Sequence, residues 1–126
     1  ALMSSSAIYL PFPRAEAYGA SKAGVKYLAA SLSLDVAQDD IRVSVICPGF
    51  VATPLTAKND FAMPMQIDVH EASLAIRVGI ERGDAEIHFP KRFTYLLKLM
   101  SFLPAFVWQK MIQRDSQAKA LKDTGR

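Results

Sequence analysis

The sequence has little that marks a secreted or membrane-spanning protein. Its single cysteine, Cys47, excludes an internal disulfide framework and is typical of a reducing compartment. There is no amino-terminal signal peptide and no uninterrupted apolar run of 18 residues. We therefore predict a cytoplasmic protein. The first residue is Ala1 rather than Met, which indicates a piece of a longer chain.

Repeats, low-complexity segments and metal-binding patterns are also missing. His70 and His88 lie far apart, and neither has a ligand-like spacing to Cys47, so we predict no metal site. Cys47 is interpreted as a small core residue. With 126 residues, 51% of them hydrophobic and 21% charged, the chain is ordinary globular material of one modest domain at most.

Acidic side chains are scarce only at the carboxy-terminal end. Residues 1–90 carry 7 Lys/Arg against 10 Asp/Glu, whereas residues 91–126 carry 8 against 2. Such a basic segment is either a solvated helix face or a surface for an anionic partner. It has no recognised nucleic-acid reader motif, so we expect no nucleic-acid partner. The apolar residues among the charges make 91–122 a candidate for peripheral membrane contact, for a cover over a substrate pocket, or for helices packed on their own domain.

Hydrophobic periodicity predicts alternating strands and helices. Residues 1–7 indicate the end of a strand and a serine-rich turn, and residues 41–47 a buried strand. Helical spacing from 16 to 38 places apolar residues on two sides of one helix. We expect one side to cover a sheet and the other to meet a neighbouring helix, which makes 16–38 the candidate interface of a homo-oligomer.

The second half continues the same alternation. Asp68 and Glu71 form a variant capping box, which predicts a helix from there to about Gly83. A short strand over 86–89 and two helices within 91–121 follow, separated near Pro104. The expected core face of the capped helix is Ala72, Ala75, Ile76, Gly79 and Ile80. Strands too far apart for hairpins predict a parallel α/β sheet.

The connection over 48–67 is long and contains three prolines, as functional loops often do. Its large apolar residues indicate an apolar cavity; they are Phe50, Leu55, Phe61, Met63 and Met65.

Tyr18 and Lys22 are the residues most suited to chemistry. Four positions apart on a helix, they share one face. A free tyrosine has a pKa of about 10, and a fixed positive charge nearby favours the phenolate and lowers that pKa. The pair therefore suits proton exchange with a substrate hydroxyl or carbonyl. The alternative is a surface lysine whose stem packs beside a tyrosine.

Two further features accompany this pair. Ser5 lies 13 positions before Tyr18, at the mouth of the preceding strand, and Pro48-Gly49 opens a loop that ends in Thr53-Pro54 after the next strand. In this order the features resemble the short-chain dehydrogenase/reductase family over about residues 1–56. The resemblance implies an α/β fold, the carboxy-terminal part of a Rossmann-like, doubly wound parallel sheet.

The resemblance also implies roles for individual residues. Tyr18 would be the general acid/base, Lys22 would assist it and bind the nicotinamide ribose of NAD or NADP, and Ser5 would hydrogen-bond the reacting oxygen. Ser4 and Ser6 flank Ser5, and Ser6 is the alternative. Further cofactor contacts, besides Tyr18 and Lys22, would be Pro48, Gly49, Val51 and Thr53. The implied reaction interconverts an alcohol and a carbonyl, and the apolar residues of 50–65 favour an apolar substrate.

The family's glycine-rich turn is missing. The six glycines stand at 19, 24, 49, 79, 83 and 125, and none forms the pyrophosphate-binding fingerprint after a strand. We expect residues 1–90 to be the carboxy-terminal half of such a domain and 91–126 a basic helical extension. The isolated chain would then be incomplete, inactive and a poor binder of cofactor. The alternatives are a non-catalytic fragment that associates with itself through an open sheet edge, or a module that binds membranes peripherally.

Overall fold

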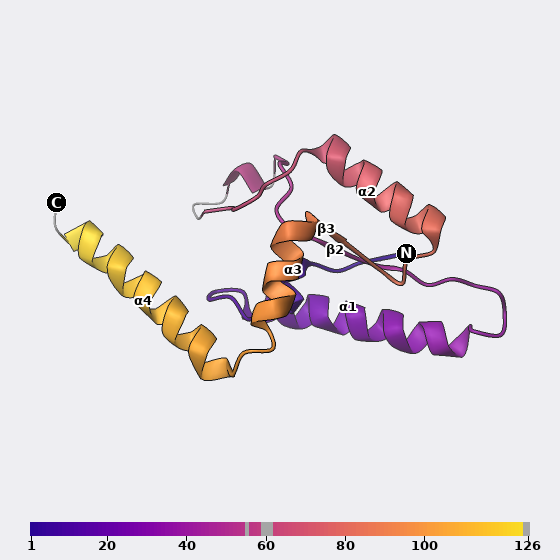
Figure 1. Cartoon of the computed structure of the whole chain (residues 1–126), viewed down its shortest axis with the longest axis horizontal. Helices are drawn as coiled ribbons and strands as arrows, with labels where there is room; N and C mark the ends of the chain where they lie inside the picture. The colour runs from indigo at the N-terminus through magenta and orange to yellow at the C-terminus, as the bar shows by residue number, and fades with distance from the viewer. Residues whose placement is uncertain (55, 59–61, 125–126) are drawn as a thin grey trace.

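The residues that the structure describes form three parallel strands and four α-helices (Figure 1). The structure is a computed structural model that describes residues 1–54, 56–58 and 62–124, with the side chains of 115–124 left out. The strands are β1 (Leu2–Met3), β2 (Val45–Pro48) and β3 (Glu86–Phe89). The helices are α1 (Glu16–Asp35), α2 (Val69–Arg82), α3 (Lys91–Met100) and α4 (Ala105–Thr124), with short 3-10 turns η1 (Ser6–Ile8) and η2 (Thr56–Lys58).

The sheet has the order β1-β2-β3, which confirms the predicted parallel α/β class. Met3 pairs with Ile46, and Ile46 pairs with Ile87. The strand expected over 41–47 is shorter, because its paired part begins only at Val45. Ladder pairing needs a partner, and β1 and β3 offer partners only from that register onward.

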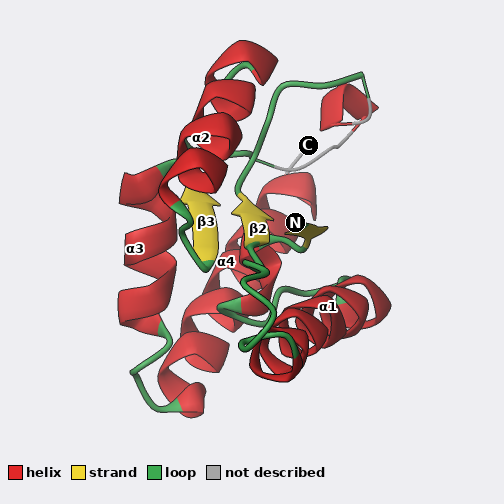
Figure 2. Ribbon diagram, turned by 90° about the vertical axis from the view of Figure 1, so that its right-hand side faces the viewer, coloured by secondary structure: helices red, strands yellow, loops and turns green. Residues whose placement is uncertain are grey.

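The two faces of the sheet carry different helices (Figure 2). Because successive side chains of a strand alternate, Ile46 faces α2 while Val45 and Cys47 face α1. One apolar cluster joins Ile46 and its β3 neighbours to α2, and another joins Val45 and Cys47 to Ala29 of α1. Cys47 is fully buried, as its interpretation as a core residue requires.

Helix α2 has the ends that its sequence predicts. The Asp68 carboxylate accepts a hydrogen bond from the Glu71 backbone N–H at 2.7 Å, and Gly83 ends the helix in the left-handed conformation at φ 74°. Four residues of the expected core face pack inward as predicted; they are Ala72, Ala75, Ile76 and Gly79. The prediction is wrong for Ile80. Its side chain is exposed, because the neighbouring Gly79 is the residue that packs on Ile87.

Helix α1 departs from prediction in two ways. It ends at Asp35 rather than near 38, where turns replace it. The expected second packed side is wrong for this chain on its own, because Tyr27, Leu28 and Leu34 are exposed. Only the side that contains Ala29 is covered by the sheet.

Helix α3 packs on the loops at the carboxyl end of the sheet. Phe93 and Leu97 join Leu10 in a third apolar cluster, which Phe50 and Trp108 border. The Trp108 indole N–H donates to the Pro11 carbonyl at 2.7 Å and fixes the start of α4. The prediction of two helices within 91–121, separated near Pro104, is confirmed by α3 and α4. A domain boundary at residue 90 stays a prediction.

Among the residues that the structure describes, no helix is both long and apolar enough to cross a membrane.

Candidate active site

Ser5 stands where β1 opens into η1. Its hydroxyl oxygen accepts a hydrogen bond from the Ala7 backbone N–H at 3.2 Å, so it caps the 3-10 turn. Ser4, Ser5 and Ser6 are all buried. The Ser4 hydroxyl donates to the Lys22 carbonyl at 2.8 Å, which ties this turn to α1. The serine segment and the helix of Tyr18 and Lys22 are therefore held together.

Tyr18 and Lys22 lie one turn apart on α1. The Lys22 ammonium nitrogen is 5.9 Å from the centroid of the Tyr18 ring. It donates to the Met3 carbonyl at 3.2 Å, at the end of β1. Tyr18 is 51% exposed. The arrangement offers an accessible phenol beside a fixed cation.

The Pro48–Thr53 segment leaves the sheet at the same edge. Because Met3 pairs with Ile46 in a parallel ladder, Ser5 and Pro48 each lie two residues beyond that pair. The Gly49 backbone N–H donates to the Phe89 carbonyl at 2.7 Å.

Close packing accounts for the glycine. A Cβ at Gly49 would lie 3.0 Å from the Phe93 ring and 3.1 Å from the Phe89 carbonyl oxygen. The requirement for glycine here comes from the approach of α3.

The loop beyond Gly49 is ordered by two threonines. Thr56 accepts from the Thr53 backbone N–H at 2.9 Å and donates to the Val51 carbonyl at 2.6 Å. Val51 also bridges Ile67 at the far end of the connection. The sheet topology brings this loop to the edge that carries Ser5. Ser4 and Met3 form the hydrogen bonds to Lys22 of α1.

The expected apolar cavity of this connection is described only in part. Phe50 packs on Phe93 with ring centroids 5.6 Å apart, and Met65 is exposed. Leu55 and Phe61 lie outside the described residues.

A charged cluster around Glu86 of β3 is not predicted by the sequence analysis. The Glu86 carboxylate lies 2.6 Å from the ammonium groups of both Lys26 and Lys98, and it accepts a 2.6 Å hydrogen bond from the Tyr9 hydroxyl. We call these four residues the Glu86 cluster. It joins β3 to α1, to α3 and to the segment that follows η1. The available signal was weak: Lys26 lies one turn after Lys22, and Glu86 alternates with the core residue Ile87.

Electrostatics follow from this packing. Burial acts to raise the pKa of Glu86, but the hydrogen bonds from Lys26, Lys98 and Tyr9 outweigh it and lower the pKa to about 2. Burial and the hydrogen bond to Glu86 raise the pKa of Tyr9. Burial also raises the pKa of the Cys47 thiol. The cluster therefore keeps a carboxylate between two ammonium groups, with a neutral phenol against it.

His88 is buried on the face of β3 that carries Glu86. It lies beside Thr94, with His88 Nδ1 and Thr94 Oγ1 2.6 Å apart. Burial, followed by the positive charges of Lys98 and Lys91, lowers the pKa of His88 to about 4. The imidazole is thus neutral near pH 7. Within the described residues no group of three His, Cys, Asp or Glu side chains is placed to hold a metal ion.

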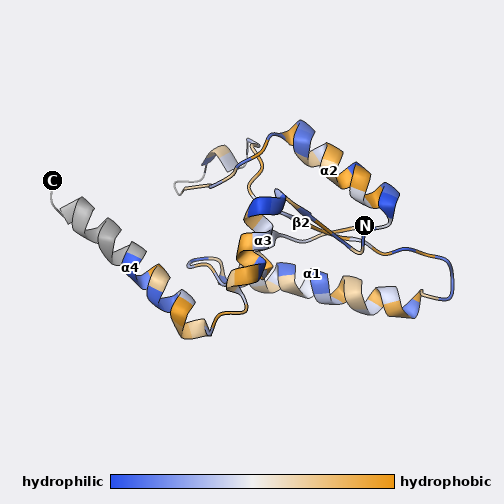
Figure 3. Cartoon of the chain, viewed as in Figure 1, coloured by the Kyte–Doolittle hydropathy of each residue, from blue (hydrophilic) through white to orange (hydrophobic). Residues whose placement is uncertain are grey.

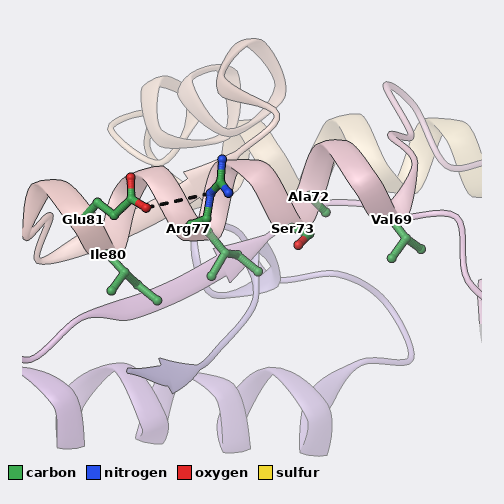
Figure 4. A pocket seen from close by; sticks show the side chains of 7 residues that line it. Val69, Ala72, Ser73, Arg77, Ile80 and Glu81 are labelled. Atoms are coloured by element: carbon green, nitrogen blue, oxygen red, sulfur yellow. Dashed lines mark ion pairs between the residues drawn. The ribbon is translucent and has the colours of Figure 1, made fainter.

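A shallow apolar groove lies elsewhere, along α2 (Figure 4). Val69 and Ile80 line it with exposed side chains, and Arg77 forms a 3.9 Å ion pair with Glu81. The groove is lined by α2 alone, on the face of the sheet opposite α1. It is separate from the edge where Tyr18 and Lys22 lie.

Parallel strands with helices on both faces, and a tyrosine–lysine pair beside the carboxyl end of β1, define part of a Rossmann-like fold. A short-chain dehydrogenase from Sphingobium yanoikuyae in complex with NADPH has the same fold, with a TM-score of 0.63 at 22% identity over 96% of this chain and 43% of that one. The family model for short chain dehydrogenases matches residues 2–63. The chain belongs to the short-chain dehydrogenase/reductase family.

Two curated relatives extend this result. An uncharacterized oxidoreductase of Myxococcus xanthus is 41% identical over 88 residues, which cover 70% of this chain and 35% of the relative. A 3beta-hydroxysteroid dehydrogenase of Eggerthella lenta is 46% identical over 55 residues, which cover 44% of this chain and 21% of that protein. The chain thus spans about a third or less of the length of these relatives.

Proposed function

We propose that this chain supplies the proton-transfer half of an NAD(P)-dependent oxidoreductase that interconverts an alcohol and a carbonyl. The observation that carries the proposal is the accessible Tyr18 phenol beside the Lys22 ammonium, 5.9 Å from its ring centroid, at the end of β1. In reduction the Tyr18 O–H donates its proton to the carbonyl oxygen, and in oxidation it accepts the proton back. The Lys22 ammonium would lie beside the phenolate that remains. Ser5 would hydrogen-bond the reacting oxygen once its hydroxyl turns from the cap.

The donors present fit the nicotinamide end of a dinucleotide. An ammonium group carries three N–H donors, so the bond from Lys22 to Met3 leaves donors for ribose hydroxyls. Pro48, Gly49, Val51 and Thr53 lie on the loop that leaves the same edge of the sheet and would line the ring. A bound nicotinamide would supply or accept the hydride. NAD and NADP are both candidates, because no position of this chain matches the family's selecting residue.

We propose an apolar alcohol or ketone as the substrate. The Eggerthella lenta relative is named for a hydroxysteroid, which is an apolar alcohol. The apolar cluster of Leu10, Phe93 and Leu97, with Phe50 at its border, lies next to the loops of the site. Apolar walls of this kind bury apolar ligands. A cytoplasmic location accords with the buried thiol of Cys47 and stays a prediction.

The test is a fusion of this chain to the amino-terminal part of the Myxococcus xanthus relative, which the chain does not span. NADPH and NADH oxidation is followed with a panel of apolar ketones. Tyr18→Phe should reduce turnover at least about a hundredfold while leaving cofactor binding and the circular dichroism spectrum unchanged. Tyr27→Phe, on the exposed side of the same helix, is the matched control and should leave turnover unchanged.

Retained turnover in the folded Tyr18→Phe fusion would contradict the role of Tyr18. A fusion that binds NADPH but reduces no ketone would contradict the proposed reaction.

A second candidate function is self-association, favoured by one specific observation. Tyr27 and Leu34 of α1 are exposed, and β1 leaves one edge of the sheet unpaired among the described strands. We propose that α1 forms a homo-oligomer contact, either in a complete enzyme or as the sole function of a non-catalytic module. Light scattering is measured on the 126-residue chain and on the fusion. A monomer at high concentration in the first would contradict the self-associating module, and in the second the contact in a complete enzyme.

A further inference from the structure

The corner between α3 and α4 exposes large apolar side chains. Phe102 is 86% exposed and Phe106 is 68% exposed. With three exposed leucines they form what we call the corner patch: Leu96, Leu99, Phe102, Leu103 and Phe106. Figure 3 shows the connection and the first turn of α4 as strongly hydrophobic, before the helix becomes hydrophilic. Large apolar side chains exposed together on one short segment indicate an interaction site.

The packing of both helices directs these side chains outward. Phe93 and Leu97 face the domain, so Leu96 and Leu99 lie on the other side of α3. Trp108 holds the start of α4 against Phe12, with ring centroids 5.9 Å apart. Two helical positions correspond to about 200°, so Phe106 points away from the side that Trp108 packs. The exposure therefore follows from how the corner is attached.

The charges around the patch have one sign. Residues 91–114 contain five basic residues and no acidic residue. Lys98 is occupied by Glu86, at 2.6 Å. The remaining four are exposed and form no ion pair with a described side chain; they are Lys91, Arg92, Lys110 and Arg114. The apolar corner is thus bordered by cations that have no acidic partner in the described part.

We propose that the corner patch inserts into the interfacial layer of a lipid bilayer whose headgroups are anionic. Such a layer offers acyl chains to Phe102 and Phe106 and phosphates to the four cations at the same time. A second copy of this chain would bring cations against cations, because both surfaces carry the same charges. Nucleic acid would satisfy the cations and leave the apolar corner in water. The inference concerns where the protein lies, and it goes beyond the proposed reaction without depending on it.

The experiment is co-sedimentation of the 126-residue chain with vesicles. One set contains phosphatidylcholine alone, and the other contains one third phosphatidylserine. Binding should be at least about tenfold tighter to the anionic set and should weaken as salt is raised, because screening reduces the attraction of the cations. Equal binding to both sets, or binding that salt does not change, would overturn the anionic partner.

Matched variants locate the contact. Phe102→Ser with Phe106→Ser should weaken binding to the anionic set at least about tenfold, since each variant removes a large apolar side chain from the interface. The control is Ile41→Ser with Leu74→Ser, where exposure is 56% and 45%, and it should change binding little. All four positions are exposed, and circular dichroism verifies that both variants fold.

Equal losses in the two double variants would overturn the corner patch as the contact. Light scattering that shows dimers abolished by the Phe102 and Phe106 changes, with no vesicle binding by the original chain, would replace the membrane with a second copy. Neither outcome depends on cofactor binding or turnover, so the membrane proposal and the oxidoreductase proposal fail separately.

Discussion

The two sides of the sheet differ in how fully this chain completes them. On one side, α2 is capped by Asp68, ended by Gly83 and packed on Ile46 and Ile87. On the other, α1 has no side-chain cap, and Ala29 is its one fully buried residue. The side covered by α2, whose two ends are both capped, carries none of the proposed catalytic residues. Tyr18 and Lys22 lie on the helix that is half uncovered.

The packing under α2 should therefore determine stability, whereas α1 carries the residues proposed for the chemistry. Substitutions under α2 should act on the free energy of unfolding, because they disturb close packing. Substitutions of Tyr18 and Lys22 should act on turnover, and substitutions of Tyr27 and Leu34 should act on association, because little of the fold rests on these side chains. The Glu86 cluster lies on the α1 side of the sheet, where it joins β3 to α1 and α3.

The largest effect on stability is expected from Gly79→Ala. The new Cβ would meet three carbons of Ile87 at 2.6 to 2.8 Å, inside the core, so α2 must move off the sheet. We expect a loss of about 2 to 3 kcal/mol in the free energy of unfolding, measured by urea titration. Gly24→Ala is the matched control on α1, where a Cβ meets nothing within 4 Å, and it should stabilise by about 0.5 to 1 kcal/mol. A loss for both variants would remove the contrast between the helices.

The pH dependence of stability should come next, through His88. Its folded pKa of about 4 lies below the ordinary value of 6.5, so the unfolded chain binds the proton more tightly. Stability is therefore full above about pH 6.5 and falls as the pH drops toward 4, by on the order of 2 kcal/mol between pH 7 and pH 5. Thermal unfolding of His88→Gln should lose this slope. His70→Gln, at an exposed position on α2, should keep it; identical slopes for the original chain and both variants would contradict the buried, neutral imidazole.

A smaller effect is expected from Glu86→Gln. The variant removes the carboxylate that Lys26 and Lys98 share and should cost about 1 to 2 kcal/mol near pH 7. Since the folded pKa of Glu86 is lowered to about 2, its contribution is present above about pH 4.5 and is lost as the pH falls through 2.

Glu81→Gln is the matched control for the Glu86 cluster. Glu81 pairs with Arg77 at 3.9 Å on an exposed surface, and its loss should cost less than about 0.5 kcal/mol. Equal costs for the two glutamates, in urea titrations near pH 7, would show that the cluster does not hold β3, α1 and α3 together.

Local signals explain which parts of the fold were predictable. The limits of α2 follow from Asp68 and Gly83, which act within one helical turn. The end of α1 has no such signal, because residues 36–38 are compatible with a helix. The sequence therefore predicts an end near residue 38, three residues later than the observed end at Asp35. The start of β2 depends on where β1 and β3 begin, which residues 41–44 do not encode.

The site divides in the same way. Tyr18 and Lys22 are neighbours because helix geometry joins positions four apart, so their proximity could be read from the sequence. Tyr9 and Glu86 are 77 positions apart, and only the folded sheet and its two helices bring them together. The roles of Ser5 and of the Pro48–Thr53 loop came from the family resemblance, and they stay predictions.

We propose that this chain carries the proton-transfer half of a dehydrogenase site without the half that binds pyrophosphate. A titration of the 126-residue chain with NADPH and NADH, followed by nicotinamide fluorescence, tests this division. We expect no saturable binding, because no glycine-rich turn after a strand is among its residues. Saturable binding that Lys22→Ala abolishes would contradict the division, since the chain would then assemble a working cofactor site by itself.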